Sequence, residues 1–312
     1  MIVRSMKESD FLRVIEIDSK AFYKVIPNLT KPRVRRLDNV KSLFDECGEE
    51  ALVLEADGKV IGSMFCHVLG EFAWIGPLSI DPDYQKNGYS KEFIKVAIER
   101  LKEKDVREIA LQTMVDAPQN VSLYIKCGFQ ADYPIFVLTK DVENNIEPSF
   151  FEDEERWTIS EFDCSMSDLE EEMNHYVLEN DIRLHFYNII SALEKNQTGK
   201  TIILKDEDGQ IRGIGILKIR SSVEESPDFL NVAHLYTKEM DETHISFMMK
   251  LIEQYAVQLN LTSVRIGING NDYLVIRELF EKGYLLSNLS QKMIYDQYCS
   301  SITNKLYGAL LG

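Results

Sequence analysis

The order of the predicted elements repeats along this chain of 312 residues. Asp57-Gly58 and Asp208-Gly209 each lie between two apolar runs, which is a strong signal for a β-hairpin. After each hairpin the pattern predicts a strand, a long amphipathic helix, a second strand, a short helix that ends at a glycine and an aromatic residue, and a last strand. A repeated order of this kind favours a tandem of one α/β fold over two unrelated domains.

Periodicity and turn residues give the bounds of the predicted elements. In the first half the strands are residues 2–4, 51–55, 60–69, 73–80, 109–114 and 135–138, and the helices are residues 9–22, 34–46, 90–103 and 120–127. In the second half the strands are residues 201–204, 211–219, 229–236, 263–267 and 291–295, and the helices are residues 167–178, 181–193, 241–259 and 273–282.

A change in composition separates the two halves. Residues 143–155 are rich in acidic side chains, contain one proline and show little periodicity, which is typical of a linker. We therefore expect one domain over residues 1–142 and a second domain over residues 156–312.

The charge of the chain limits the partners that it can bind. The sequence has 51 acidic and 35 basic residues, for a net charge of −16. This field repels nucleic acid and anionic lipid, so we expect no binding to either. A polyanionic cofactor would have to be held by a local device, such as a set of backbone N–H groups.

Cysteine spacing and hydropathy exclude other classes of protein. The five cysteines are scattered and form no CxxC pair, so we expect no metal site. The opening MIVRSMKESD is charged, and no run reaches the roughly 18 apolar residues that a membrane span needs. The sequence therefore predicts a cytoplasmic protein with no membrane association.

The segment from Leu78 to Ser90 has the strongest signal for a ligand. A strand ends there, a short polar loop follows, and an amphipathic helix begins near residue 90. Such a junction directs unpaired backbone N–H groups and the positive end of the helix dipole towards one point, which suits a diphosphate. Gly88 allows close approach of the backbone, and Lys86 adds a positive charge. A plain turn with a solvated lysine is the structural alternative.

Two motifs of the first half resemble those of the GCN5-related N-acetyltransferase (GNAT) family. Residues 85–90 match the family's cofactor loop, Gln/Arg-x-x-Gly-x-Gly/Ala, except that Ser90 replaces the last small residue. Residues 120–129 are similar to the family's Asn…Leu-Tyr-x-x-x-Gly-Phe element. The resemblance implies an α/β (α+β) fold of two tandem GNAT-like domains, each a mixed, mostly antiparallel sheet flanked by helices.

The resemblance also implies an activity and a set of site residues. The activity is N-acyl transfer from acyl-CoA, with acetyl-CoA as the expected donor and a primary amine of a small molecule or peptide as acceptor. Tyr124 occupies the family's general-acid position, from which a phenol protonates the departing thiolate of coenzyme A. The implied coenzyme A-binding residues are Leu78, Ser79, Ile80, Gln85, Lys86, Asn87, Gly88, Tyr89, Ser90 and Asn120.

Several alternatives stay open at this point. Tyr124 is also compatible with a core tyrosine whose hydroxyl is bonded elsewhere. The general base is not fixed, because Glu71, Asp81, Asp116 and His67 all lie near the predicted central strands. A non-catalytic coenzyme A-binding sensor is the alternative function, and a homodimer is left open as the oligomeric state.

The second half lacks the ligand signals. Its counterpart of the loop, residues 235–243, contains three carboxylates and no glycine, which opposes both the charge and the close approach of a diphosphate. The later element has Leu279-Phe280 in place of Leu123-Tyr124, so the phenol is missing. We expect a degenerate domain that shapes the acceptor site or stabilises the first domain.

Overall fold

The structure is a computed structural model of the chain. It describes residues 1–25, 31–142, 158–162, 184–219, 221, 223–237, 242–295 and 306–307. The predicted linker at residues 143–155 and the predicted helix at residues 167–178 lie outside these ranges. The proposed domain bounds therefore stay a prediction.

The first half contains every strand and helix that the sequence predicts. Its elements are β1 (Ile2–Ser5), α1 (Phe11–Val25), α2 (Leu37–Cys47), β2 (Ala51–Ala56), β3 (Lys59–Leu69), β4 (Phe72–Ile80), α3 (Tyr89–Lys102), β5 (Glu108–Met114), α4 (Pro118–Lys126) and β6 (Phe129–Asp141). The main difference is β6, which begins six residues before the expected strand at 135–138. Its first part mixes exposed polar residues with Pro134, so an apolar pattern does not reveal it.

The second half repeats this order. Its elements are β7 (Thr158–Phe162), α6 (Tyr187–Asn196), β8 (Gly199–Lys205), β9 (Ile211–Lys218), β10 (Leu230–Thr237), α7 (Glu242–Gln258), β11 (Ser263–Asn269), α8 (Tyr273–Glu281), β12 (Leu285–Tyr295) and β13 (Leu306–Tyr307). The expected helix at 181–193 is wrong at its start, because residues 184–186 are not helical. Like β6, β12 begins six residues before its expected start at residue 291.

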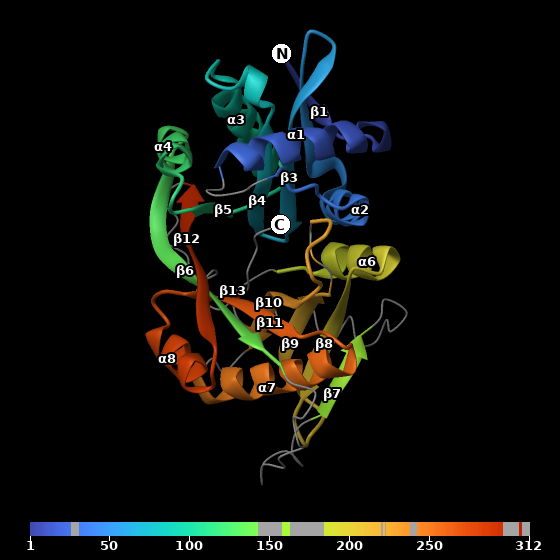
Figure 1. Cartoon of the computed structure of the whole chain (residues 1–312), viewed down its shortest axis with the longest axis vertical. Coiled ribbons are helices and arrows are strands. Elements are labelled where there is room, and N and C mark those ends of the chain that lie inside the picture. Colours follow the sequence, from blue (N-terminus) through green and yellow to red (C-terminus); the bar gives the residue numbers. More distant parts are fainter. Residues whose placement is uncertain are drawn as a thin grey trace.

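The strands of the described residues form one continuous sheet of 13 strands with helices on both faces (Figure 1). The order is β1-β2-β3-β4-β5-β12-β6-β11-β10-β9-β8-β7, and β13 pairs with β10. The pairs β4–β5 and β10–β11 are parallel, and the other pairs in this order are antiparallel. The fold class predicted from the sequence, two mixed and mostly antiparallel sheets flanked by helices, is confirmed, with the two sheets joined into one.

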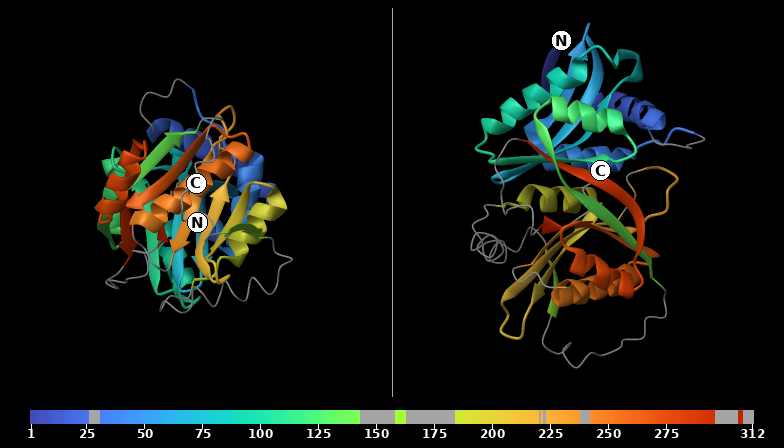
Figure 2. Two further views of the ribbon diagram at one scale, coloured as in Figure 1. Left: turned by 90° about the horizontal axis from the view of Figure 1, so that it is seen from below. Right: turned by 90° about the vertical axis from the view of Figure 1, so that its left-hand side faces the viewer.

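The two halves exchange their last strands. β12 of the second half pairs with β5 from Tyr295↔Ile109 to Ser290↔Met114. β6 of the first half pairs with β11 from Asn269↔Ile135 to Ser263↔Asp141. β6 and β12 also pair with each other along most of their lengths, and they cross between the two halves of the molecule (Figure 2). Each half therefore completes the sheet of the other.

Alternation of side chains in the strands produces two cores in the first half. In β2, Leu52 and Leu54 face a cluster with Phe93 and Ile94 of α3. The intervening residues of β2, Ala51 and Val53, face a second cluster that contains residues of α1 and α2. A period of two in the strand thus places α3 on one face of the sheet and α1 and α2 on the other.

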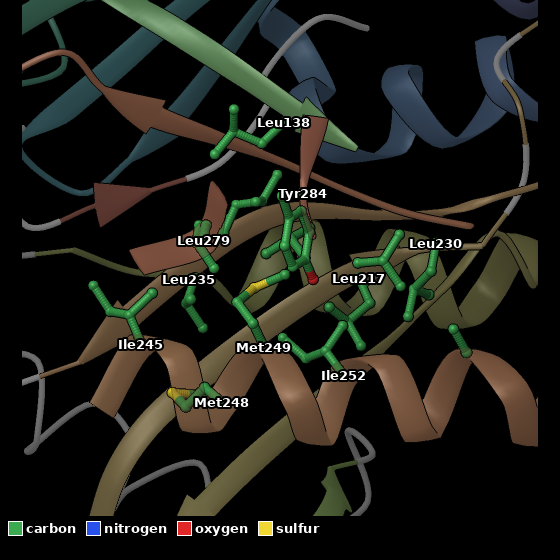
Figure 3. Close-up of a cluster of buried hydrophobic side chains, with 14 of the residues drawn as sticks. Leu138, Leu217, Leu230, Leu235, Ile245, Met248, Met249, Ile252, Leu279 and Tyr284 are labelled. Atoms are coloured by element: carbon green, nitrogen blue, oxygen red, sulfur yellow. The ribbon is translucent and has the colours of Figure 1, made fainter. Parts of the chain in front are cut away.

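The second half has its own core and shares another with the first half. Leu138 of β6 packs among Leu279, Tyr284 and residues of α7, which shows the exchanged strand inside the core of the second half (Figure 3). A separate cluster joins Phe72 and Trp74 of β4 to residues of α6, β8, β9 and β10. The two halves are therefore packed together through buried apolar side chains as well as through strand pairing.

Candidate active site

The two central strands of the first half separate where the sequence predicts a coenzyme site. β4 and β5 pair in parallel from Phe72↔Glu108 to Ile75↔Leu111, and the pairing ends there. Beyond Ile75, β4 pairs only with β3, and β5 pairs with β12 on its other side. Leu78, Ser79 and Ile80 lie on this unpaired part of β4. Their backbone edge on the side of β5 is consequently free of strand partners among the described residues.

The loop after β4 leads into α3 through two residues with positive φ, Lys86 and Gly88. Gly88 is the N-cap residue of α3, with φ of +81°. A Cβ atom built on Gly88 would meet no atom within 4 Å, so open space lies over this residue. Lys86 also has a positive φ, of 67°, and is exposed. These conformations explain why the loop needs a glycine at residue 88, since a side chain there would be strained.

The N–H groups of this loop are available to a ligand. Within the described residues, no oxygen accepts a hydrogen bond from the backbone N–H of any residue from 85 to 90. Gly88 instead uses its carbonyl oxygen, which accepts from Lys91 N at 3.1 Å and from Glu92 N at 3.3 Å. The unpaired N–H groups coincide with the positive end of the α3 dipole, the arrangement that favours a bound phosphate group.

Side chains of the loop stabilise its shape. Gln85 Nε2 donates to the carbonyl oxygen of Ile80 at 3.0 Å. Asn87 Nδ2 donates to the carbonyl oxygen of Tyr84 at 3.4 Å, and the rings of Tyr84 and Tyr89 lie 6.5 Å apart. Ser90 lies in the first turn of α3 and is partly buried. The predicted residues 85–90 thus divide into side chains that hold the turn and N–H groups that stay open.

Tyr124 lies on α4, against the same core as α3. Its ring contacts the ring of Phe129 edge-on, with centroids 5.9 Å apart. No side chain or backbone group of the described residues forms a hydrogen bond with its hydroxyl group, so the alternative of a tyrosine bonded elsewhere has no support there. Burial raises the pKa of Tyr124 to about 12. The phenol therefore keeps its proton at neutral pH and has it available to donate.

The ends of α3 and α4 lie near each other. Burial is the main cause of the raised pKa of Cys127, which directly follows α4. The charges of Lys91 and Glu92 in the first turns of α3 also act on this pKa. Asn120 lies in the first turn of α4, where its N–H donates to the carbonyl oxygen of Ala117 at 2.9 Å. Tyr124 and the open loop consequently share one end of the first domain.

Three of the four candidate bases are engaged in other interactions. Asp81 is buried and forms an ion pair with Arg13 at 2.5 Å. Glu71 pairs with Arg107 at 3.1 Å, and His67 contacts both a carboxylate and a backbone carbonyl. Asp116 is exposed. The geometry therefore leaves the general base unassigned and argues against Asp81, Glu71 and His67 as free proton acceptors.

The structure adds residues around β4 that the sequence did not indicate. Ser79 Oγ donates to Asp18 Oδ1 at 2.6 Å, and Asp18 also forms a buried ion pair with Arg35 at 2.6 Å. On the far side of β5, Ser290 and Lys292 of β12 come from the second half of the chain. No local pattern could predict these neighbours, because they depend on which strands pair.

The counterpart of the loop in the second half is described only in part. Residues 238–241 lie outside the described ranges, and α7 begins at Glu242. Counting back from the glycines with positive φ, Gly128 and Gly283, places Leu279 rather than Phe280 at the position of Tyr124. Leu279 is buried and Phe280 is exposed, so the expected correspondence is shifted by one residue. The phenol is missing under either alignment.

No metal site or membrane helix appears among the described residues. They contain no group of three or more His, Cys, Asp or Glu side chains that could hold a metal ion. None of the helices in the same ranges combines the length and the apolar character of a membrane span.

Comparison with known proteins agrees with the geometry of the first half. Residues 11–129 match the profile of the Acetyltransferase (GNAT) family. A Bacillus subtilis (strain 168) protein, provisionally assigned as a ribosomal protein bS18 alanine N-acetyltransferase, is 29% identical over 132 residues, which cover 41% of this chain and 80% of that protein.

Solved structures match the whole chain. A provisionally assigned acetyltransferase from Pyrococcus horikoshii has a TM-score of 0.68 at 15% identity, over 100% of this chain and 94% of its own. A tandem GNAT protein from the clavulanic acid biosynthesis pathway has a TM-score of 0.62 at 9% identity, over 94% of this chain and 97% of its own. At these identities the likeness concerns the fold. Residues 11–129 therefore resemble the Acetyltransferase (GNAT) family, and the chain as a whole has the fold of two GNAT-like domains in tandem.

Proposed function

We propose that this protein transfers an acyl group, with the acetyl group of acetyl-CoA as the expected one, to a primary amine by direct attack of the amine on the thioester. Its GNAT domain supports N-acetyltransferase activity. The observation that carries the proposal is the set of unpaired N–H groups at residues 85–90, next to the point where β4 and β5 separate. These groups would hold the pyrophosphate of coenzyme A, and the free edge of β4 at Leu78, Ser79 and Ile80 would bind the pantetheine arm.

In the proposed reaction the amine nitrogen bonds to the thioester carbon, the C–S bond breaks, and the amine proton passes to water. Tyr124 donates its phenolic proton to the departing sulfur and recovers a proton from solvent. Its raised pKa, about 12, keeps it in the donating form at neutral pH. A backbone N–H of β4 beyond Ile75 would stabilise the charge on the thioester oxygen. Asn120, in the first turn of α4, would contribute to binding of the pantetheine arm.

The acceptor is proposed as a class rather than a compound. The Bacillus subtilis relative is described as acting on an alanine of a ribosomal protein, so peptides with N-terminal alanine belong in the test set beside polyamines and aminoglycosides. We place the reaction in the cytoplasm. A single chain carries all the proposed site residues, so a homodimer is not needed for the reaction.

Release of free thiol from acetyl-CoA tests the proposal. Turnover with one member of the amine panel is expected for the wild-type protein, and Tyr124→Phe should lower kcat by about 10²-fold while Kd for coenzyme A changes less than about twofold. Tyr133→Phe is the matched control, because Tyr133 is an exposed tyrosine on β6 of the same domain. Coenzyme A binding without turnover across the panel would favour the sensor, and full activity of Tyr124→Phe would refute the role of the phenol.

A further inference from the structure

A buried ionic cluster joins the two halves of the chain beside β4. Glu46, on α2, is only 3% exposed. Its carboxylate lies 3.2 Å from Lys218 Nζ at the end of β9 and 3.2 Å from His67 Nδ1 on β3. Ser42 Oγ donates to Glu46 at 3.1 Å and lies 3.1 Å from Thr198 Oγ1 of the second half. The carboxylate therefore has partners from α2, β3 and β9, which belong to both halves.

The partners of His67 show how the cluster reaches the candidate site. His67 Nδ1 faces the Glu46 carboxylate, and His67 Nε2 lies 3.0 Å from the carbonyl oxygen of Gly76. The ring thus lies between two hydrogen-bond acceptors, the carboxylate and the carbonyl. Gly76 is the first residue of β4 after the pairing with β5 ends at Ile75. The ring therefore ties the Glu46 carboxylate to the backbone at the start of the free edge of β4.

The charges around Glu46 keep its buried carboxylate ionised. Burial by itself would raise the pKa of Glu46, but Lys218 and His67 outweigh it and lower this pKa to about 2. His234 of β10 is buried against the ring of Phe186. Burial first, and then the charges of Lys218 and His67, lower the pKa of His234 to about 3, so it adds no charge at neutral pH. The Glu46 carboxylate thus lies between the Lys218 ammonium and the His67 ring, and the ammonium is a counter-charge that Glu46 loses if Lys218 is replaced.

We propose that Lys218 is a positioning residue, which acts from the second domain through Glu46 and His67 on the backbone of β4 at Gly76. This inference rests on the proposed function, since it assigns that stretch of β4 to the bound thioester. Without the ammonium, the buried Glu46 carboxylate lacks this counter-charge and is no longer fixed between two partners. His67 would then hold the Gly76 carbonyl less firmly, and the N–H groups of β4 would lose their alignment with the thioester. The second domain would thereby set the geometry of the reaction without touching the substrates.

Two measurements on Lys218→Met test this inference, and the first does not depend on activity. Amide hydrogen exchange of the β4 peptide should speed up about 10-fold over residues 76–80 and stay unchanged at the start of α3. The steady-state kcat should fall about 10-fold, while Kd for coenzyme A, which is set mainly by the loop at residues 85–90, should change less than about twofold.

The controls separate positioning from a general loss of stability. Lys195→Met removes an exposed ion pair between Lys195 of α6 and Asp45 of α2, another link between the two halves, and should leave both readouts unchanged. Lys218→Arg keeps the positive charge and should therefore show the exchange rate in β4 and the kcat of the wild type. If Lys218→Met does not fold, Lys218→Gln, which keeps a donor without the charge, takes its place with the same expectations. The double variant Lys218→Met/His67→Leu should be no slower than His67→Leu alone, because both act through one path.

The outcomes distinguish this inference from the proposed function. Unchanged exchange in β4 overturns the inference whether or not a substrate is known. Faster exchange with an unchanged kcat, or multiplied effects in the double variant, also overturns it. A wild-type protein that releases no thiol with any amine refutes the proposed function instead, and the exchange measurement still decides whether Lys218 controls β4.

Discussion

Two residues in the first domain have features that suit the proposed coenzyme. Gly88 adopts φ of +81° under open space, and Tyr124 keeps a hydroxyl with no bonding partner in the described part of the chain. Glycine adopts this φ without strain, so the loop can turn its N–H groups outward. A phosphate would accept from those N–H groups, and a departing sulfur would accept from the phenol.

The acid sensitivity of the fold should depend on Glu46. Its pKa is lowered from 4.5 to about 2, so the unfolded chain binds this proton more readily than the folded one. The stabilisation is complete above pH 4.5 and is lost as pH falls towards 2, with a full size on the order of 3 kcal/mol. Urea unfolding of the wild type and Glu46→Gln between pH 6 and pH 3 measures it. The difference in unfolding free energy should shrink as pH falls, and a difference independent of pH would contradict the assignment.

Most elements could be predicted from the sequence, because each one follows from local patterns. The Asp-Gly turns, the period of α3 and the glycine after α4 are all visible within about a dozen residues. The exchange of β6 and β12 could not be predicted in this way, since the strands occupy equivalent places in the repeat and either could pair with β5. The same limit applies to the site. Residues 85–90 and Tyr124 belong to local motifs that can be found in the sequence, whereas Glu46, His67 and Lys218 come together only after folding.

A substitution in β12 should destabilise the first domain although the strand belongs to the second half. Met293 is fully buried, lies opposite Leu111 and packs in the cluster that contains α3. Met293→Ala should lower the free energy of unfolding by about 2–5 kcal/mol. Leu286→Ala is the control on the same strand, because Leu286 is 48% exposed, and it should cost about 1 kcal/mol or less.

Chemical denaturation of both variants gives these values, and hydrogen exchange locates the effect. Exchange should rise in α3 and β5 of Met293→Ala. If the two variants lose the same amount of stability, or if the increase is confined to α7 and α8, the pairing of β12 with β5 is wrong.

The two halves of the molecule share one sheet and one apolar cluster. If the second half is removed, β5 loses its neighbour β12 and β6 loses its partner β11. Removal also exposes Phe72, Trp74 and the rest of the shared apolar cluster to water. A chain of this kind should unfold in one transition, even though its sequence contains two repeats.

A fragment of residues 1–142 should therefore fail to fold on its own. It would expose strand edges and apolar surface together, which promotes aggregation. We expect no cooperative melting transition by circular dichroism and no binding of coenzyme A, with the full chain as the control. A fragment that melts cooperatively and binds coenzyme A like the full chain would show that the exchanged strand is dispensable.

Calorimetric titration of the wild type and two glycine variants gives the Kd of coenzyme A and so tests whether it binds to the loop at residues 85–90. Gly88→Val and Gly209→Val each place a side chain at a positive φ under open space, so both should cost about 1–2 kcal/mol of stability. Gly209 lies in the turn between β8 and β9 of the other domain. Coenzyme A should bind the wild type and Gly209→Val with equal Kd, and Gly88→Val at least about 10-fold more weakly. Equal Kd for all three proteins, or no binding to the wild type, would contradict binding at this loop.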